Sequence, residues 1–148
     1  MSSSRRAARP DAGLAARRLA LLALFEAEFR PGLAGDALDR LADERGASAA
    51  VRAHAAELVA GVERYAPELD ARIALQAPAI PVAELGRVER AILRSALYEM
   101  LYSAATPSGE AIRDAVSLAR IYAGDAARRL VNGVLGSVSR SSGRGAQP

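Results

Sequence analysis

Hydrophobic residues recur every three or four positions along most of this chain, which is the spacing of one face of an α-helix. No segment has the strict apolar-polar alternation that is typical of a β-strand. The pattern predicts a first helix from about Ala12 to Phe29, with Asp11 as its cap and Pro31-Gly32 at its end. A short second helix is predicted over Asp36–Arg45. The core-facing residues predicted for these two helices are Leu14, Leu21, Leu24, Phe25, Phe29, Leu38 and Leu41.

The middle of the chain predicts two further helices that are separated at a proline. Ser48 starts the third helix, and the segment after Pro67 forms the fourth, which Pro78 and Pro81 close. Their apolar stripes consist of Val51, Ala55, Leu58, Val59 and Val62 in the third helix and of Leu69 and Ile73 in the fourth.

A fifth helix, predicted over about Gly86 to Ala104, is apolar around most of its circumference and should be the buried hub of the fold. Two charged residues, Arg94 and Glu99, interrupt it. A buried charge is costly unless it is paired and hydrogen-bonded, so we expect these side chains to anchor neighbouring helices or cap carbonyl groups. The apolar positions of this helix are Val88, Ile92, Leu93, Ala96, Leu97, Met100 and Leu101.

Two more helices complete the predicted fold. Thr106-Pro107 supplies a cap and a first-turn proline for the sixth helix, and Gly124-Asp125 supplies a stop followed by a cap for the seventh. Seven amphipathic helices with short connections predict an all-α bundle. The core positions of these two helices are Ile112, Ala115, Val116, Ala119, Leu130, Val131, Val134, Leu135 and Val138.

Composition excludes several classes of chemistry. The 148 residues include no cysteine and one histidine, His54, which excludes disulfides, thiolate zinc sites and Cys-His nucleophile pairs. The chain has no glycine-rich phosphate loop and no acid pair in a catalytic context. We therefore expect neither an enzyme, nor a cofactor, nor a metal site. Without an apolar run of 18 residues or a signal sequence, the expected location is the cytoplasm and not a membrane.

Basic residues gather at the two ends of the chain. Residues 1–18 hold five arginines against Asp11 alone, although the whole chain has a net charge of only +3. Every basic residue is arginine, whose planar fork suits phosphate oxygens, so the ends favour a nucleic-acid partner. Genomic bias accounts for most of the absence of lysine, but it does not explain the placement of the charge. The terminal arginines are Arg5, Arg6, Arg9, Arg17, Arg18, Arg140 and Arg144.

Two segments, Leu85–Met100 and Leu130–Leu135, together resemble the NusB family of transcription antitermination factors. The shared pattern is an acidic-basic pair, an Ile-Leu-Arg triplet and a Tyr-Glu pair, followed by a Val-Asn-Gly-Val-Leu run that opens the last helix. The resemblance is specific over about Asp70 to Val138, roughly half the chain. The matching residues are Glu89, Arg90, Ile92, Leu93, Arg94, Tyr98, Glu99, Pro107, Ile112, Asp114, Ala115, Leu118, Ala119, Tyr122 and Val131 to Leu135.

The resemblance implies two small helical bundles sharing a central helix. It also implies an adaptor that binds the boxA element of nascent ribosomal RNA together with NusE, a small-subunit ribosomal protein. Such an adaptor helps to assemble an RNA polymerase antitermination complex on ribosomal RNA operons and carries no catalytic residues. By the same resemblance, Glu89 is expected on the NusE side. The RNA side is expected to include Arg5, Arg6, Arg9, Arg17, Arg18, Tyr122, Gly124, Asp125, Arg128 and Arg129.

Each candidate also has a plainer interpretation. Tyr122 either stacks on a base or closes the apolar face of the sixth helix, and Arg128 and Arg129 either bind phosphate or form a solvated charged face. Two departures concern the RNA side, because Gly13 to Ala16 interrupt the N-terminal arginines and the loop Ala123 to Ala127 has few polar groups.

Two other functions stay open. One is the NusB-like domain of a ribosomal RNA cytosine methyltransferase, which the polar tail without a methyl-donor domain disfavours. The other is an adaptor that binds only protein. The expected organisation is a disordered arm over residues 1–10, a NusB-like helical domain over 11–139 and a flexible tail over 140–148. The sequence leaves the choice between a monomer and a homodimer undecided.

Overall fold

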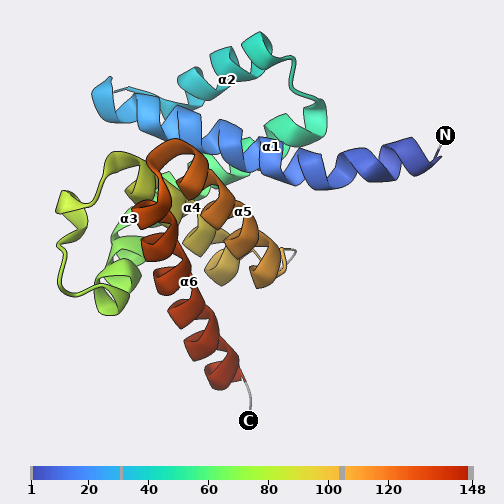
Figure 1. The fold of residues 1–148 in the computed structure, drawn as a ribbon. Coiled ribbons are helices and arrows are strands. Elements are labelled where there is room, and N and C mark those ends of the chain that lie inside the picture. The colour runs from blue at the N-terminus through green and yellow to red at the C-terminus, as the bar shows by residue number, and fades with distance from the viewer. Residues whose placement is uncertain (1, 31, 104–105, 147–148) are drawn as a thin grey trace. The chain divides into compact units, whose positions relative to one another are not determined.

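The computed structural model describes the backbone of residues 2–30, 32–103 and 106–146, and the side chains of residues 12–30, 32–103 and 106–141. Throughout that part the regular structure is helical, which confirms the all-α prediction (Figure 1). None of the described helices is both long enough and apolar enough to cross a bilayer. The elements in chain order are α1 (Ser2–Phe29), α2 (Ala34–Arg45), α3 (Ala49–Gln76), the 3₁₀ turn η1 (Val82–Glu84), α4 (Arg87–Tyr102), α5 (Ser108–Ala123) and α6 (Asp125–Ala146).

The predicted number of helices was too high by one, because the third and fourth predicted helices form a single helix. Helix α3 runs through Pro67, although an interior proline removes one hydrogen bond and costs about 3 kcal/mol. Leu58 and Val62 are buried before the proline, and Leu69 and Ile73 are fully buried after it. This continuous buried face stabilises the helix on both sides of Pro67.

Contacts divide the chain into two compact units, residues 1–60 and residues 61–148. In the first unit, α1 packs against α2. The predicted core position Leu21 is buried, but Leu14, Leu24 and Phe25 are half-buried, and Phe29 is 57% exposed, so its predicted core role was wrong. The pattern underweighted alanine, whose small side chain allows helices to approach closely. The buried face of α1 consists of Ala16, Leu19, Ala20, Leu21 and Ala23, together with the charged Arg17.

The helix boundaries agree with the local signals of the sequence. Gly46 ends α2 with a positive φ of 62°, a conformation that a glycine adopts without strain. The Ser48 hydroxyl accepts a hydrogen bond from the Val51 N–H at 3.2 Å, as expected for the cap of α3. Thr106 was expected to cap the sixth helix, but Pro107 occupies that position in α5. The Thr106 hydroxyl instead donates a hydrogen bond to the Glu99 carboxylate at 3.0 Å.

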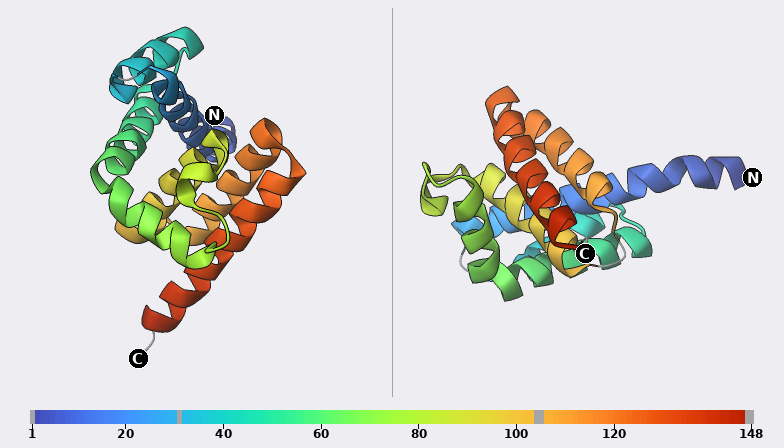
Figure 2. Two further views of the ribbon diagram at one scale, coloured as in Figure 1. Left: turned by 90° about the vertical axis from the view of Figure 1, so that its left-hand side faces the viewer. Right: turned by 90° about the horizontal axis from the view of Figure 1, so that it is seen from below.

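In the second unit, α4 packs against α5 and α6, and α5 and α6 run side by side (Figures 1 and 2). Helix α4 is the predicted hub, because most of its middle is buried. The buried residues of this helix are Ala91, Ile92, Leu93, Ser95, Ala96, Leu97 and Glu99.

The two charges within the hub tie neighbouring segments together, as predicted. The Arg94 guanidinium donates two parallel hydrogen bonds of 2.7 Å to the Asp70 carboxylate on α3. Glu99 is almost completely buried and holds Thr106, in the segment that follows α4. Both side chains therefore have structural roles.

Breaking the Arg94–Asp70 pair is expected to destabilise the fold measurably. The side chain of Arg94 is 21% exposed and that of Asp70 is 30% exposed, so solvent weakens the pair. We expect Arg94→Met or Asp70→Asn to lower the free energy of unfolding by about 1–2 kcal/mol. Urea denaturation of both single variants and the double variant measures the coupling between them, which we expect to be about 1 kcal/mol. Strictly additive costs would show that the two side chains act independently.

Three of the four tyrosines form a cluster that the sequence analysis did not predict. Tyr65 on α3 stacks on Tyr102 of α4 with ring centroids 4.1 Å apart, and Tyr98 lies about 6 Å from both. Gly61 provides the space for this cluster, because a Cβ atom there would overlap the Tyr98 ring. The pairing of Gly61 with Tyr98 fixes how closely α3 and α4 approach each other in the second unit.

Helical backbone extends beyond the predicted bounds at both ends, since α1 starts at Ser2 and α6 ends at Ala146. Arginine and alanine are good helix formers and favour the extension of α1, whereas the serines and glycines at the end of α6 do not favour a helix. The side chains of residues 1–11 and 142–148 lie outside the described part. The disordered arm and the flexible tail therefore stay predictions.

Candidate RNA and protein interface

The connection between α5 and α6 consists of a single glycine. Gly124 has φ +94°, and its N–H donates to the carbonyls of Ala119 and Arg120, both at 3.1 Å. Its own carbonyl accepts the N–H of Arg128 at 3.1 Å, which starts the hydrogen bonding of α6. A side chain would strain this backbone, so the predicted stop is also what brings the end of α5 next to the start of α6.

Asp125, the first residue of α6, holds both candidate arginines of this turn. Its Oδ1 accepts a hydrogen bond from Arg128 Nε at 2.7 Å, and its Oδ2 accepts one from Arg129 Nη1. All three side chains reach solvent, with Arg129 64% and Asp125 59% exposed. The hydrogen bond from Arg128 holds the pKa of the Asp125 carboxyl below its usual value and raises the pKa of the Arg128 guanidinium.

The last turn of α5 adds three exposed side chains to this turn. Tyr122 follows the buried Leu118 by four residues, at the end of the apolar face of α5, and it is 38% exposed, which leaves part of the side chain accessible for stacking. Ile121 is 52% exposed and Arg120 is also exposed. The sequence analysis missed these two residues, although the helical period places Arg120 opposite the buried Ala111, Ala115 and Leu118.

The two candidate arginines of α1 differ from each other. Arg17 is 5% exposed and interacts within the fold, which favours a structural role over contact with RNA. Arg18 is half-buried and lines a cavity of about 300 Å³ with Arg45, which the sequence analysis missed. Among the residues whose side chains are described, those that line this cavity include two arginines and no acidic residue, which suits an anion. Arg5, Arg6 and Arg9 lie outside the residues whose side chains are described.

Glu89, the candidate contact for a protein partner, lies in the first turn of α4. Its half-buried carboxylate folds over Gly86, where a Cβ atom would lie 2.9 Å from Oε2. An acidic group at this position complements the positive end of the helix. Part of the Glu89 side chain still reaches solvent, where a basic group can approach it.

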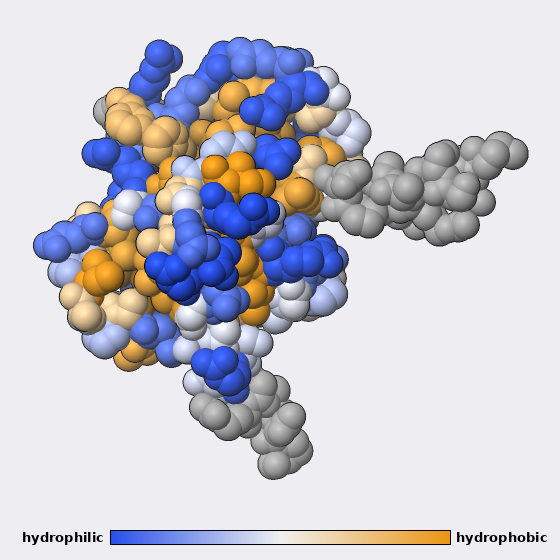
Figure 3. All heavy atoms as spheres, viewed as in Figure 1, coloured by the Kyte–Doolittle hydropathy of each residue, from blue (hydrophilic) through white to orange (hydrophobic). Residues whose placement is uncertain are grey.

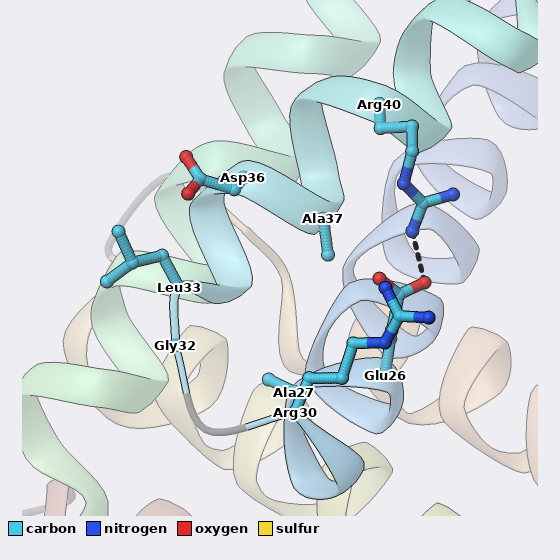
Figure 4. Close-up of a pocket in the computed structure, with 8 residues that line it drawn as sticks. All are labelled: Glu26, Ala27, Arg30, Gly32, Leu33, Asp36, Ala37 and Arg40. Carbon is cyan, nitrogen blue, oxygen red and sulfur yellow. Dashed lines mark hydrogen bonds and ion pairs between the residues drawn. The ribbon is translucent and has the colours of Figure 1, made fainter.

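A second cavity in the first unit, of about 340 Å³, lies between the end of α1 and the start of α2 (Figure 4). The Arg40 guanidinium points at the Glu26 carboxylate across it, and Arg30 and Asp36 complete its charges. The hydrogen bond from Arg40 lowers the pKa of the Glu26 carboxyl. Because two positive charges balance two negative ones, this cavity lacks the net positive charge that a phosphate site requires.

Hydrophobic residues reach the surface in several separate patches on the face drawn in Figure 3. The large hydrophobic residues with the highest exposure are Phe29, Leu33, Leu75, Ile80, Tyr102, Ile121 and Tyr122.

The model of the NusB family matches residues 14–140 of this chain. A transcription antitermination protein NusB from Heliobacterium modesticaldum is 36% identical over 124 residues, which cover 84% of this chain and 60% of that protein. A NusB from Dehalococcoides mccartyi is 33% identical, with 85% of this chain and 88% of that protein covered. The chain thus spans about three fifths of the first relative and most of the second.

Solved structures agree with this similarity. The NusB chain in a crystal structure of antitermination factors NusB and NusE with double-stranded RNA superposes with a TM-score of 0.80 at 26% identity. The superposition covers 88% of this chain and 98% of that chain. This chain belongs to the NusB family of transcription antitermination proteins, which are not enzymes.

Proposed function

We propose that this protein binds the boxA element of nascent ribosomal RNA together with NusE, in the cytoplasm, and so supports processive transcription of ribosomal RNA operons. The observation that carries the RNA part is the exposed Tyr122, which lies one glycine-linked turn from Arg128 and Arg129. An aromatic ring and guanidinium groups on the two helices that one turn joins offer a stacking face for a base and forks for phosphates. The similar NusB structure that contains NusE and RNA supports the same assignment.

The RNA surface in this proposal has two parts. One is the turn from α5 to α6, where Gly124 sets the backbone and Tyr122, Arg128 and Arg129 provide the contacts. The other is the cavity that Arg18 and Arg45 line, to which we add Arg5, Arg6 and Arg9, which precede it in the sequence. Arg17 is assigned to the core rather than to the RNA.

Glu89 is the proposed contact for NusE. Its carboxylate is part-exposed at the start of α4, where it can accept hydrogen bonds from a basic side chain of the partner.

Replacing both arginines of the turn, Arg128→Gln with Arg129→Gln, is expected to weaken binding to single-stranded boxA RNA about tenfold at near-physiological salt. The loss of up to two phosphate contacts should also flatten the slope of log affinity against log salt, by at most about 1.4. Fluorescence anisotropy with labelled boxA RNA and a scrambled RNA, across a salt series and with or without NusE, measures both quantities.

The matched control is Arg40→Gln with Arg52→Gln. These arginines are also exposed and ion-paired, to Glu26 and Asp43, and their loss changes the net charge equally. We expect this control to retain boxA affinity and salt slope within about twofold. An equal loss of boxA affinity in both double variants would show that the affinity depends on net charge and not on Arg128 and Arg129 in particular. If the protein bound NusE but showed no preference between boxA RNA and the scrambled RNA, the result would favour an adaptor that binds only protein.

A further inference from the structure

Arg128 and Arg129 differ from the other candidate arginines, because the same carboxylate occupies both of them. Asp125 accepts one hydrogen bond from each guanidinium through its two oxygens. Arg120 and Arg18, by contrast, have no hydrogen-bond or ion-pair partner among the residues whose side chains are described. Of the three arginines at this turn, Arg120 is exposed and has no such partner, whereas Arg128 and Arg129 both pair with the Asp125 carboxylate.

A carboxylate and a phosphate use the same donors of a guanidinium. The planar carboxylate and the tetrahedral phosphate both accept two parallel N–H donors, so one edge of a guanidinium binds either the carboxylate or the phosphate. Asp125 takes Nε of Arg128 and one terminal nitrogen of Arg129, and these donors must be released before they can bind a phosphate. The charge of Asp125 also repels a phosphate, because the two would lie well within the screening length of about 8 Å at physiological salt.

We propose that Asp125 is an internal competitor of the RNA backbone for Arg128 and Arg129, and thereby limits the RNA affinity of this turn. The proposal rests on the proposed RNA-binding function. It assigns Asp125 the opposite role from the RNA contact that the family resemblance implied, since the residue restrains binding without touching RNA. Exposed ion pairs are weak, so phosphates can displace the carboxylate, which makes Asp125 a limit on affinity and not a block.

The competition does not depend on pH near neutrality. The Arg128 hydrogen bond keeps the pKa of Asp125 below its usual value, so the carboxyl is ionised throughout the physiological range. Among the described residues, the other charged groups at this turn are the guanidinium groups of Arg120, Arg128 and Arg129. RNA affinity at this turn should therefore not rise on mild acidification, and a substitution is needed to relieve the competition.

The test is Asp125→Asn, which removes the charge but keeps the shape of the side chain at the start of α6. We expect boxA affinity to rise about fivefold at 0.1 M salt. The salt slope should steepen by part of the total of about 1.4 that two phosphate contacts can contribute, since Asp125 no longer occupies the two guanidinium groups. Thermal unfolding checks that the variant is folded.

The matched control is Asp43→Asn, which changes the net charge equally and frees Arg52 from an ion pair of 2.6 Å in the other unit. We expect less than a twofold change in boxA affinity for this control. An equal rise in both variants would attribute the effect to net charge and overturn the proposal. A fall in affinity for Asp125→Asn would also overturn it, because it would show that Asp125 orients the two arginines for RNA.

A double-mutant cycle separates this proposal from the RNA assignment itself. The loss caused by Arg129→Gln should be several-fold larger in the Asp125→Asn background than in the native chain. The loss caused by Arg120→Gln should be the same in both backgrounds, because no ion pair joins Arg120 to Asp125. If Arg129→Gln weakens binding equally in both backgrounds, the proposed competition by Asp125 is wrong, but the assignment of an RNA site to this turn is kept. If neither arginine matters in either background, the RNA site at this turn fails.

Discussion

Replacing Leu97 by alanine is expected to lower the free energy of unfolding by about 3–4 kcal/mol, the largest effect of any single substitution considered for this protein. Leu97 lies in the middle of α4 and is completely buried. Alanine at this position loses the transfer free energy of the deleted carbon atoms and leaves a cavity, because the surrounding helices relax only partly. Urea denaturation followed by far-ultraviolet circular dichroism measures the change.

Leu75→Ala is the matched control for this experiment. The same atoms are removed near the end of α3, but Leu75 is 70% exposed and its deletion opens no cavity. We expect a change within about 0.5 kcal/mol. A cost for Leu97→Ala as small as that of the control would mean that α4 is not the buried hub of the second unit.

Replacing Gly61 by valine is expected to cost about 2–3 kcal/mol, the second largest effect. The new Cβ atom would overlap the ring of Tyr98, which lies beside the stacked pair of Tyr65 and Tyr102. Either the ring leaves the cluster or α3 moves away from α4, and both outcomes lose contacts. The midpoint of urea unfolding and the near-ultraviolet circular dichroism of the tyrosines report the two effects separately.

Gly133→Val provides the control, because Gly133 lies within α6 and a Cβ atom there meets nothing within 4 Å. Valine and glycine differ little in helix propensity, so we expect a change of less than about 0.5 kcal/mol. Similar costs at both positions would indicate a general intolerance of valine in these helices, rather than a collision with Tyr98.

Sequence reasoning predicted the fold well where a local signal decides the structure. Gly46 and Gly124 end helices through positive φ, and Ser48 caps α3 through its hydroxyl, so each of these boundaries depends on one residue. The hub helix was predictable because its own apolar side chains cover most of its circumference. The continuity of α3 was not, because tertiary burial of Leu69 and Ile73 outweighs the local cost of Pro67.

The candidate site was only partly predictable, since its properties depend on side-chain partners. The order Asp125, Arg128, Arg129 shows that one carboxylate can reach both arginines, at spacings of three and four residues. That spacing was interpreted as a cap followed by two phosphate ligands, and the pairing among the three was missed. Burial of Arg17 and the cavity formed by Arg18 and Arg45 depend on tertiary packing, which a linear pattern does not encode.

The uneven distribution of aromatic residues gives each unit its own optical signal. All four tyrosines belong to residues 61–148, both phenylalanines belong to residues 1–60, and the chain has no tryptophan. Tyrosine emission and absorbance therefore report on the second unit without any label, whereas backbone circular dichroism reports on both. Coincident melting curves from the two probes would indicate that the units unfold as one cooperative system, and separated curves would give each unit its own transition temperature.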